Sequence, residues 1–423
     1  MAIAKKIEDL TPPNHDFLEL TFVGMTATGA GNNQQFTMEN LGDGTFKATT
    51  SRVGIRVGLN KPKTFIVPMD EWDDVYAQKI SRGFLLTKTK KMAKKIIKKS
   101  GQYRALDDKD VEDIINFLLM AANQTVSQNY SVSIEDISDE MIEFGRNILK
   151  ELAESQDTLS VAAFNAKLHQ LYSAIPRRID NLSKMDVHRQ KEFKDKLSNE
   201  QELLDFMVAQ IRSNGAADMS NNPTILDAYG MDWRRVTAEE ENYIKNMLAG
   251  NRSQYLRAWR VSNHKTEDAF EKYCKNKNLT EENGITRLFH GSRTENFWSI
   301  TTNGLYLNPS GVAINGKAFG HGLYFAPKAQ KSLGYTSRLN SYWVNGSSDK
   351  GYLAIYKVAT GTIYDVYGEK LGTPDNYKQL QEKKPGADCL WAYAGKGYVV
   401  NDEVIVYRED QCTIEYFIEM AAA

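Results

Sequence analysis

The sequence contains few cysteines and no long hydrophobic run, and both absences narrow the class of protein. Its 423 residues include three cysteines, Cys274, Cys389 and Cys412, which are widely separated and form no CxxC pair. Their odd number and wide spacing argue against a disulfide framework and against a zinc site, and favour a reduced intracellular compartment. No apolar stretch approaches the ~18 residues that a membrane span needs, and the N-terminus has no apolar signal core. We therefore expect no metal ligand and no membrane partner.

Net charge is also nearly absent, at −1 for the whole chain at pH 7. This balance hides a local block. Between Arg82 and Arg104 the chain has seven lysines and two arginines and no acidic residue. Such a block is typical of a surface that binds a polyanion, although a solvated helix face or a linker has the same composition. Both interpretations remain open from the charges themselves.

The length suggests two or three domains, and 41% hydrophobic with 25% charged residues is an ordinary globular composition. Residues 16–80 contain short runs rich in Phe, Thr, Val and Ile, separated by turn sequences. This pattern predicts a small antiparallel sheet, followed by a helix that Asp70 is placed to cap. Residues 106–214 predict a series of amphipathic helices, of which Asp107 or Asp108 caps the first.

A composition break at residues 213–224 predicts a linker, and strands and helices alternate beyond it. Strands are predicted at 231–236, 255–263, 286–292, 321–326, 351–359 and 403–409, and helices at 237–250 and 266–277.

Three short segments of the last third carry chemically useful groups: LFHGSR at 288–293, FGHGLYFA with KSLGY at 319–335, and NDEVIVY at 401–407. A histidine before glycine offers a directional polar group beside a backbone that a ligand can approach. A Gly-x-Gly turn before aromatic residues offers flat faces for a planar ring. A carboxylate before a strand can steady positive charge or accept a proton. Taken singly, each has a plainer interpretation: a structural histidine, core aromatics and a solvated glutamate.

Together and in this order, the three segments resemble the catalytic domain of the poly(ADP-ribose) polymerases, over about residues 222–420. The resemblance implies an enzyme that consumes NAD⁺ as substrate, without a metal, and transfers its ADP-ribose. It implies that Glu403 is the catalytic carboxylate, which contacts the ribose 2′-hydroxyl and orients the acceptor, and that His290 and Tyr324 complete the catalytic set. The transition state of this reaction resembles an oxocarbenium ion, which a fixed carboxylate stabilises.

The same resemblance implies the NAD⁺-binding groups. Tyr335 stacks on the nicotinamide ring and Tyr324 forms the opposite wall, while the Gly291 backbone and the Ser332 hydroxyl bind the carboxamide. His290 holds the adenosine ribose, and its sequence neighbours Ser292 and Arg293 also contact NAD⁺.

The sequence departs from the family pattern at three positions near the site. Pro327 stands where the family usually has Asp, His321 where Lys is common, and Tyr306 where an Arg near the adenosine is common. Because the set of His290, Tyr324 and Glu403 is intact, we expect activity.

The resemblance extends upstream. Residues 106–221 resemble the family's helical regulatory domain, and residues 16–104 resemble its DNA-sensing WGR domain, although Thr50 and Ser51 replace the namesake Trp and first Gly. On this basis we expect nucleic-acid contacts from Arg52 and from the basic block, at Lys88, Lys90 and Lys91. The expected fold is α+β and multidomain: a small antiparallel β-sheet WGR-like domain at 1–105, an all-α helical bundle at 106–221 and a mixed α+β ADP-ribosyltransferase domain at 222–423.

The implied function is a poly(ADP-ribose) polymerase activated by broken or nicked DNA, whose acceptors are nearby proteins and itself. Two alternatives stay open: a mono-ADP-ribosyltransferase acting on a specific protein or nucleic-acid end, and a non-catalytic nucleic-acid-binding scaffold. The expected location is intracellular: nuclear in a eukaryote, and cytoplasmic or nucleoid-associated in a bacterium or for a virus.

Overall fold

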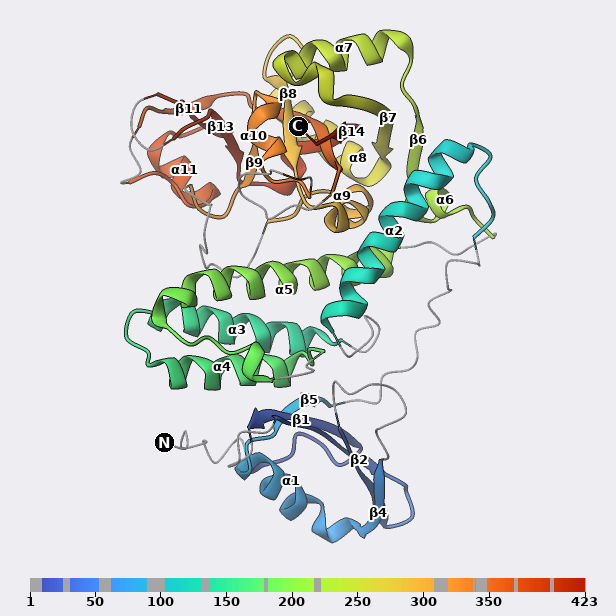
Figure 1. The fold of residues 1–423 in the computed structure, drawn as a ribbon, viewed down its shortest axis with the longest axis vertical. Helices are drawn as coiled ribbons and strands as arrows, with labels where there is room; N and C mark the ends of the chain where they lie inside the picture. Colours follow the sequence, from blue (N-terminus) through green and yellow to red (C-terminus); the bar gives the residue numbers. More distant parts are fainter. Residues whose placement is uncertain are drawn as a thin grey trace. The chain divides into compact units, whose positions relative to one another are not determined.

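The computed structural model describes most of the chain (Figure 1). The chain divides into two compact units. Residues 1–97 with 124–208 form the first unit, and residues 98–123 with 209–423 form the second. The described residues are 10–25, 31–52, 62–89, 103–130, 137–178, 182–216, 222–307, 319–337, 339, 348–368, 372–395 and 399–422. Each unit is considered by itself below. Among the described residues, no helix is long and apolar enough to cross a membrane.

The first unit contains a five-stranded antiparallel sheet in the order β4-β3-β2-β1-β5. Its elements are β1 (Phe17–Met25), β2 (Gly31–Asn40), β3 (Thr45–Arg52), β4 (Lys63–Pro68), α1 (Trp72–Ser81) and β5 (Leu85–Lys88). Trp72, Tyr76 and Ile80 of α1 pack into one core with apolar residues of the strands, which confirms the predicted sheet and helix. The predicted cap is wrong: Asp70 lies in a 3-10 turn, Met69–Glu71, that precedes the helix and moves its start to Trp72.

The helices predicted for residues 106–214 are present among the described residues. They are α2 (Lys109–Asn129), α3 (Asp139–Ser155), α4 (Val161–Ala174) and α5 (Phe193–Ala216), of which α2 and α5 contain residues of both units. Asp108 caps α2, since its Oδ1 accepts hydrogen bonds from the Asp110 and Val111 backbone amides at 3.0 and 3.2 Å. Ser173 of α4 accepts one from the Val23 amide of β1 at 2.7 Å, so the helices pack directly on the sheet. The predicted linker begins too early, because α5 continues to Ala216.

The second unit contains two sheets, with orders β6-β7-β14-β10-β8 and β11-β12-β13-β9. The strands are β6 (Met231–Arg235), β7 (Tyr255–Asn263), β8 (Ile285–Gly291), β9 (Leu323–Phe325), β10 (Lys350–Ala359), β11 (Ile363–Val366), β12 (Cys389–Ala392), β13 (Glu403–Val406) and β14 (Cys412–Ala421). The helices are α6 (Ile225–Tyr229), α7 (Ala238–Leu248), α8 (His264–Lys277), α9 (Phe297–Asn303), α10 (Ala329–Leu333) and α11 (Tyr377–Lys383). The strands and helices predicted beyond residue 224 are confirmed, and the unit is mixed α+β.

Among the described residues, an isolated bridge joins the two sheets of the second unit. Phe289 at the end of β8 and Ala326 after β9 exchange backbone hydrogen bonds of 2.8 and 2.9 Å. This bridge brings the end of β8 beside β9, and β9 pairs in turn with β13. The three sequence segments singled out above therefore meet at this junction.

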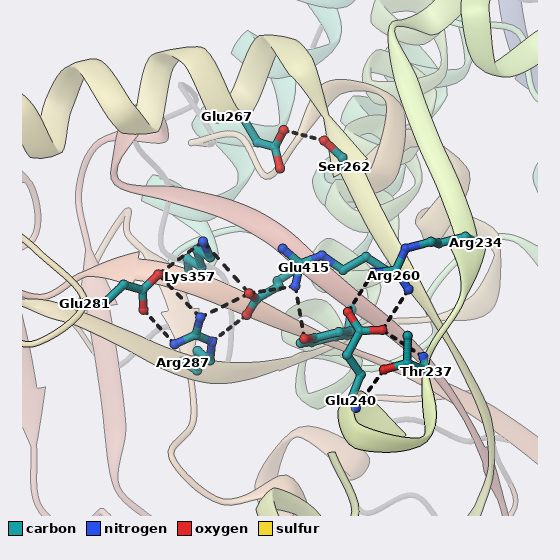
Figure 2. A network of polar contacts seen from close by, with 11 residues as sticks. Arg234, Thr237, Glu240, Arg260, Ser262, Glu267, Glu281, Arg287, Lys357 and Glu415 are labelled. Atoms are coloured by element: carbon teal, nitrogen blue, oxygen red, sulfur yellow. Dashed lines mark hydrogen bonds and ion pairs between the residues drawn. The ribbon is translucent and has the colours of Figure 1, made fainter. Parts of the chain in front are cut away.

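In the second unit, α7 and α10 cover one face of the five-stranded sheet and share a core cluster with its strands. The strands of this sheet also carry a group of charged side chains that surround Glu415 of β14 (Figure 2). The Glu415 carboxylate, 3% exposed, accepts hydrogen bonds from Arg260 of β7 at 2.9 Å and from Arg287 of β8 at 2.6 Å. Lys357 of β10 lies 3.9 Å away. These pairs link four neighbouring strands through one buried carboxylate.

Candidate active site

His290 lies at the end of β8, with its ring Nδ1 3.0 Å from the carbonyl oxygen of Tyr324. Because a carbonyl oxygen only accepts, Nδ1 must carry a proton and donate it, which leaves Nε2 as an acceptor. Burial lowers the pKa of His290, and the bond to the Tyr324 carbonyl only partly opposes this. The imidazole is therefore neutral at pH 7, and its Nε2 can accept a hydrogen bond from a ligand hydroxyl.

Gly291 touches the backbone of α10 so closely that no side chain fits. A Cβ at this position would lie 1.9 Å from the carbonyl oxygen of Ser332. The Ser332 hydroxyl is buried and donates to the carbonyl of Phe289 at 3.2 Å. The Gly291 backbone and the Ser332 side chain, both predicted to bind the carboxamide, thus lie side by side.

Both glycines of the Gly-x-Gly turn are required by close contacts. Gly320 has a positive φ of 69°, and a Cβ there would lie 2.2 Å from Cα of Asp375. A Cβ at Gly322 would lie 2.1 Å from Cγ2 of Ile405 on β13. The turn can therefore lie flat against β13, which places the aromatic strand β9 beside the strand that carries Glu403.

Tyr324 of β9 is held by this turn. Its hydroxyl donates to the Gly320 carbonyl at 2.9 Å and accepts from the Phe319 amide at 2.9 Å. Tyr335 follows α10, with its backbone amide bonded to the Ser332 carbonyl at 3.1 Å, and burial raises the pKa of its phenol. Both positions suit neutral aromatic walls, and the stacking of nicotinamide between them remains a prediction.

Glu403 begins β13 and forms an ion pair with Lys331 of α10 through its Oε1. Both side chains are largely buried, with 12% of Lys331 and 13% of Glu403 exposed. Burial lowers the pKa of the Lys331 ammonium to about 8. The ion pair holds the carboxylate through one of its two oxygens.

Lys331 is a residue to which the sequence interpretation gave no role. It was part of the matched Lys-Ser-x-x-Tyr segment, next to Ser332, but its partner is 72 positions further along the chain. Its position in the motif was the one sign in the sequence that Lys331 could belong to the site. Its pairing with Glu403 could be identified only from the folded structure.

The other residues singled out near the site have local contacts of their own. Ser292 accepts a hydrogen bond from the Asn296 side chain at 2.9 Å, and Arg293 occupies the extended position before a 3-10 turn. Of the three departures, His321 donates its backbone amide to the Asp375 carbonyl at 2.7 Å. Their contacts with NAD⁺ remain predictions. Within the described part of the chain, no cluster of His, Cys, Asp and Glu side chains converges on a metal position.

The residues predicted to bind nucleic acid differ in their surroundings. Arg52 is exposed at the end of β3. Lys88 is 11% exposed and lies 3.5 Å from Glu19, its cross-strand partner on β1, so its ammonium is directed to a carboxylate inside the sheet. Lys90 and Lys91 lie outside the described residues.

Comparisons with known proteins place His290, Tyr324 and Ser332 in a region that a known family matches, whereas Glu403 lies beyond the end of that match. The family model described as the poly(ADP-ribose) polymerase catalytic domain matches residues 237–393. The chain is 32% identical over 185 residues to a "Putative poly [ADP-ribose] polymerase-like 100L" of Invertebrate iridescent virus 6, which covers 43% of this chain and 93% of that protein. It is 26% identical over 314 residues to a "Poly [ADP-ribose] polymerase 1" of Xenopus laevis, which covers 67% of this chain and 31% of the relative. A protein of the same name from Danio rerio aligns over 81% of this chain and 37% of its own length, at 22% identity.

Proposed function

Because the chain belongs to the poly(ADP-ribose) polymerase family and is an NAD⁺ ADP-ribosyltransferase, we propose that Glu403 is its catalytic carboxylate and that broken DNA activates it. In this proposal it transfers ADP-ribose to nearby proteins and to itself, and extends the product into a polymer. The observation that carries the assignment of Glu403 is its buried pairing with Lys331, at the junction where the three motif segments meet.

The chemistry suits these groups. Nicotinamide leaves as a neutral base from an already cationic ring, so its departure needs no general acid. Positive charge then develops on the ribose, as in glycoside hydrolysis, and a carboxylate fixed beforehand stabilises it. Lys331 binds one oxygen of Glu403, and the other is available to accept a hydrogen bond from the ribose 2′-hydroxyl. The same oxygen then orients the acceptor hydroxyl.

NAD⁺ would be held from both ends of this junction. The neutral Nε2 of His290 accepts a hydrogen bond from an adenosine ribose hydroxyl. The backbone of Gly291 and the hydroxyl of Ser332 are close enough to bind one carboxamide together. Tyr324 and Tyr335 supply the aromatic walls for the nicotinamide ring.

We also propose that residues 1–105 act as a WGR-like DNA sensor, residues 106–221 as a helical regulatory domain and residues 222–423 as the catalytic domain. The support is the basic block from Arg82 to Arg104 and the exposed Arg52. The pairing of Lys88 with Glu19 weighs against that lysine as a phosphate ligand. Binding through such a block falls steeply with salt, because each neutralised phosphate releases counterions.

Labelled NAD⁺ tests the proposal. The full chain is incubated with it, with and without nicked DNA, and the products are separated on a gel. A DNA-dependent smear of high molecular weight is expected, and it disappears in Glu403→Gln. The control is Glu382→Gln, an exposed glutamate of α11. A discrete band would favour mono-transfer instead, and no transfer under any condition would overturn the enzymatic assignment.

A further inference from the structure

Three aromatic side chains form a row at the ends of β11 and β12. Tyr367 follows β11, while Trp391 and Tyr393 lie on and just after β12. The rings of Tyr367 and Tyr393 are stacked, with centroids 4.8 Å apart and planes 10° from parallel. Trp391 continues the row, 6.0 Å from Tyr393 at 18°. These three residues are called the aromatic row below.

The aromatic row is fixed at its middle ring and open at its Tyr367 end. The Tyr393 hydroxyl donates to Oδ1 of Asp365 at 2.9 Å, which holds the middle ring in place. Tyr367 contacts Tyr393 with one ring face, yet 61% of the residue is exposed. Its other face is therefore open to a planar ligand. A large aromatic side chain with so much of its surface exposed gains little from burial, so its contribution to folding does not account for it.

The aromatic row is one strand away from the proposed catalytic carboxylate. β12 pairs with β13, and Ala392 lies opposite Glu403. Because side chains alternate along a strand, Trp391 and Tyr393 lie on the other face of the sheet from Glu403. The Ala394 amide donates to Asp402 at 2.8 Å, which ties the end of the row to the residue before Glu403.

The chemistry around the aromatic row selects its ligand. Flat heteroaromatic rings stack on exposed tyrosine and tryptophan, and nucleobases do so with useful affinity. The carboxylates of Asp365 and Asp402 lie nearby, and they disfavour a phosphate at this point while they can accept from an exocyclic amino group. Adenine has such an amino group, and every ADP-ribose unit carries one adenine.

We propose that the aromatic row binds the adenine base of an ADP-ribose unit, with the open face of Tyr367 as the stacking surface. This inference rests on the proposed function for its ligand, since a growing chain supplies adenines next to the catalytic strand. It assigns to β11 and β12 a binding site for the ADP-ribose chain, separate from the site that binds NAD⁺ and on the opposite face of the sheet from Glu403.

Photolabelling with azido-AMP, an AMP that carries a photoreactive azide on its base, tests the proposal on the full chain. Labelled peptides are identified by mass spectrometry. Label is expected on the peptides that contain Tyr367 and Tyr393, and AMP should compete for it while ribose 5-phosphate, which lacks the base, should not. Tyr367→Ala should lower the label there by at least about fivefold, the effect of losing one base–aromatic stack. Tyr243→Ala, a 39% exposed tyrosine of α7, serves as the control and should leave it unchanged.

The assay needs no turnover, so it separates this inference from the proposed function. Glu403→Gln should be labelled on the aromatic row as strongly as the unaltered chain, even though it makes no polymer. The absence of label from both peptides would overturn the inference, as would label that Tyr367→Ala leaves unchanged. Equal competition by AMP and ribose 5-phosphate would show binding through the sugar phosphate and would also overturn it.

Discussion

Replacing Lys331 with methionine tests how the proposed catalytic carboxylate is held. Methionine keeps most of the side-chain volume and removes the charge, so the substitution removes the partner of Glu403 while α10 stays packed. A hydrogen bond to a charged group contributes about 1.5–3 kcal/mol. If Glu403 depends on it to stay aimed at the ribose, kcat for NAD⁺ cleavage should fall roughly ten- to hundredfold.

The pH dependence gives the same prediction an independent readout. Burial lowers the pKa of Lys331 to about 8. The ammonium is therefore present below that pH, and it is lost as the pH rises through 8, so the ion pair with Glu403 is lost in the same interval. We expect kcat of the unaltered enzyme to fall above pH 8, by about tenfold for each pH unit once the lysine is mostly neutral.

Nicotinamide release measured from pH 6 to 10 separates the variants. Lys331→Met should have low activity and lack the decline above pH 8, because it has no proton to lose. Lys331→Arg should keep activity at pH 9 to 10, because a guanidinium stays charged there. If Lys331→Met has the kcat of the unaltered enzyme and the same decline at high pH, then Lys331 does not position Glu403.

Two further substitutions test the framework of the site. Gly291→Ala places a Cβ 1.9 Å from the Ser332 carbonyl, so it should destabilise the catalytic unit by about 1–3 kcal/mol and abolish NAD⁺ binding, measured by urea unfolding and calorimetry. Gly250→Ala, with nothing within 4 Å, is its control and should change stability by less than about 0.5 kcal/mol. Glu415→Gln removes the buried carboxylate that Arg260 and Arg287, both partly exposed, share, and it should lower stability by about 3 kcal/mol. A changed KM for NAD⁺ in the folded variant would contradict a purely structural role.

Much of the catalytic unit follows from local pattern. The strand at 255–263 and the run at 351–359 are predicted because β-branched and aromatic residues cluster between turn signals, and both are strands in the structure. β14 was missed although it is the central strand of its sheet. Its side chains are buried along almost its whole length, so it lacks the alternation that marks a half-exposed strand.

Contacts at the N-terminal sheet also depend on residues that are far apart in the sequence. Lys88 belongs to a basic block by sequence, but strand pairing places it opposite Glu19, which is 69 positions earlier. The tight fit of Gly320 against Asp375 likewise joins residues that no local rule connects. Local chemistry predicts which groups are useful, and strand register decides which of them meet.

The backbone bridge between Phe289 and Ala326 fixes the distance between the two sheets that carry the site residues. His290 continues the strand of Phe289 in one sheet, whereas Glu403 belongs to the other, so this junction sets the distance between the two residues proposed to contact the dinucleotide. Because its two hydrogen bonds join backbone atoms, the bridge is kept when a side chain is replaced. A single inserted residue would shift the register and turn every following side chain to the opposite face. Such an insertion would leave both sheets folded, but His290 and Glu403 would no longer face the same ligand.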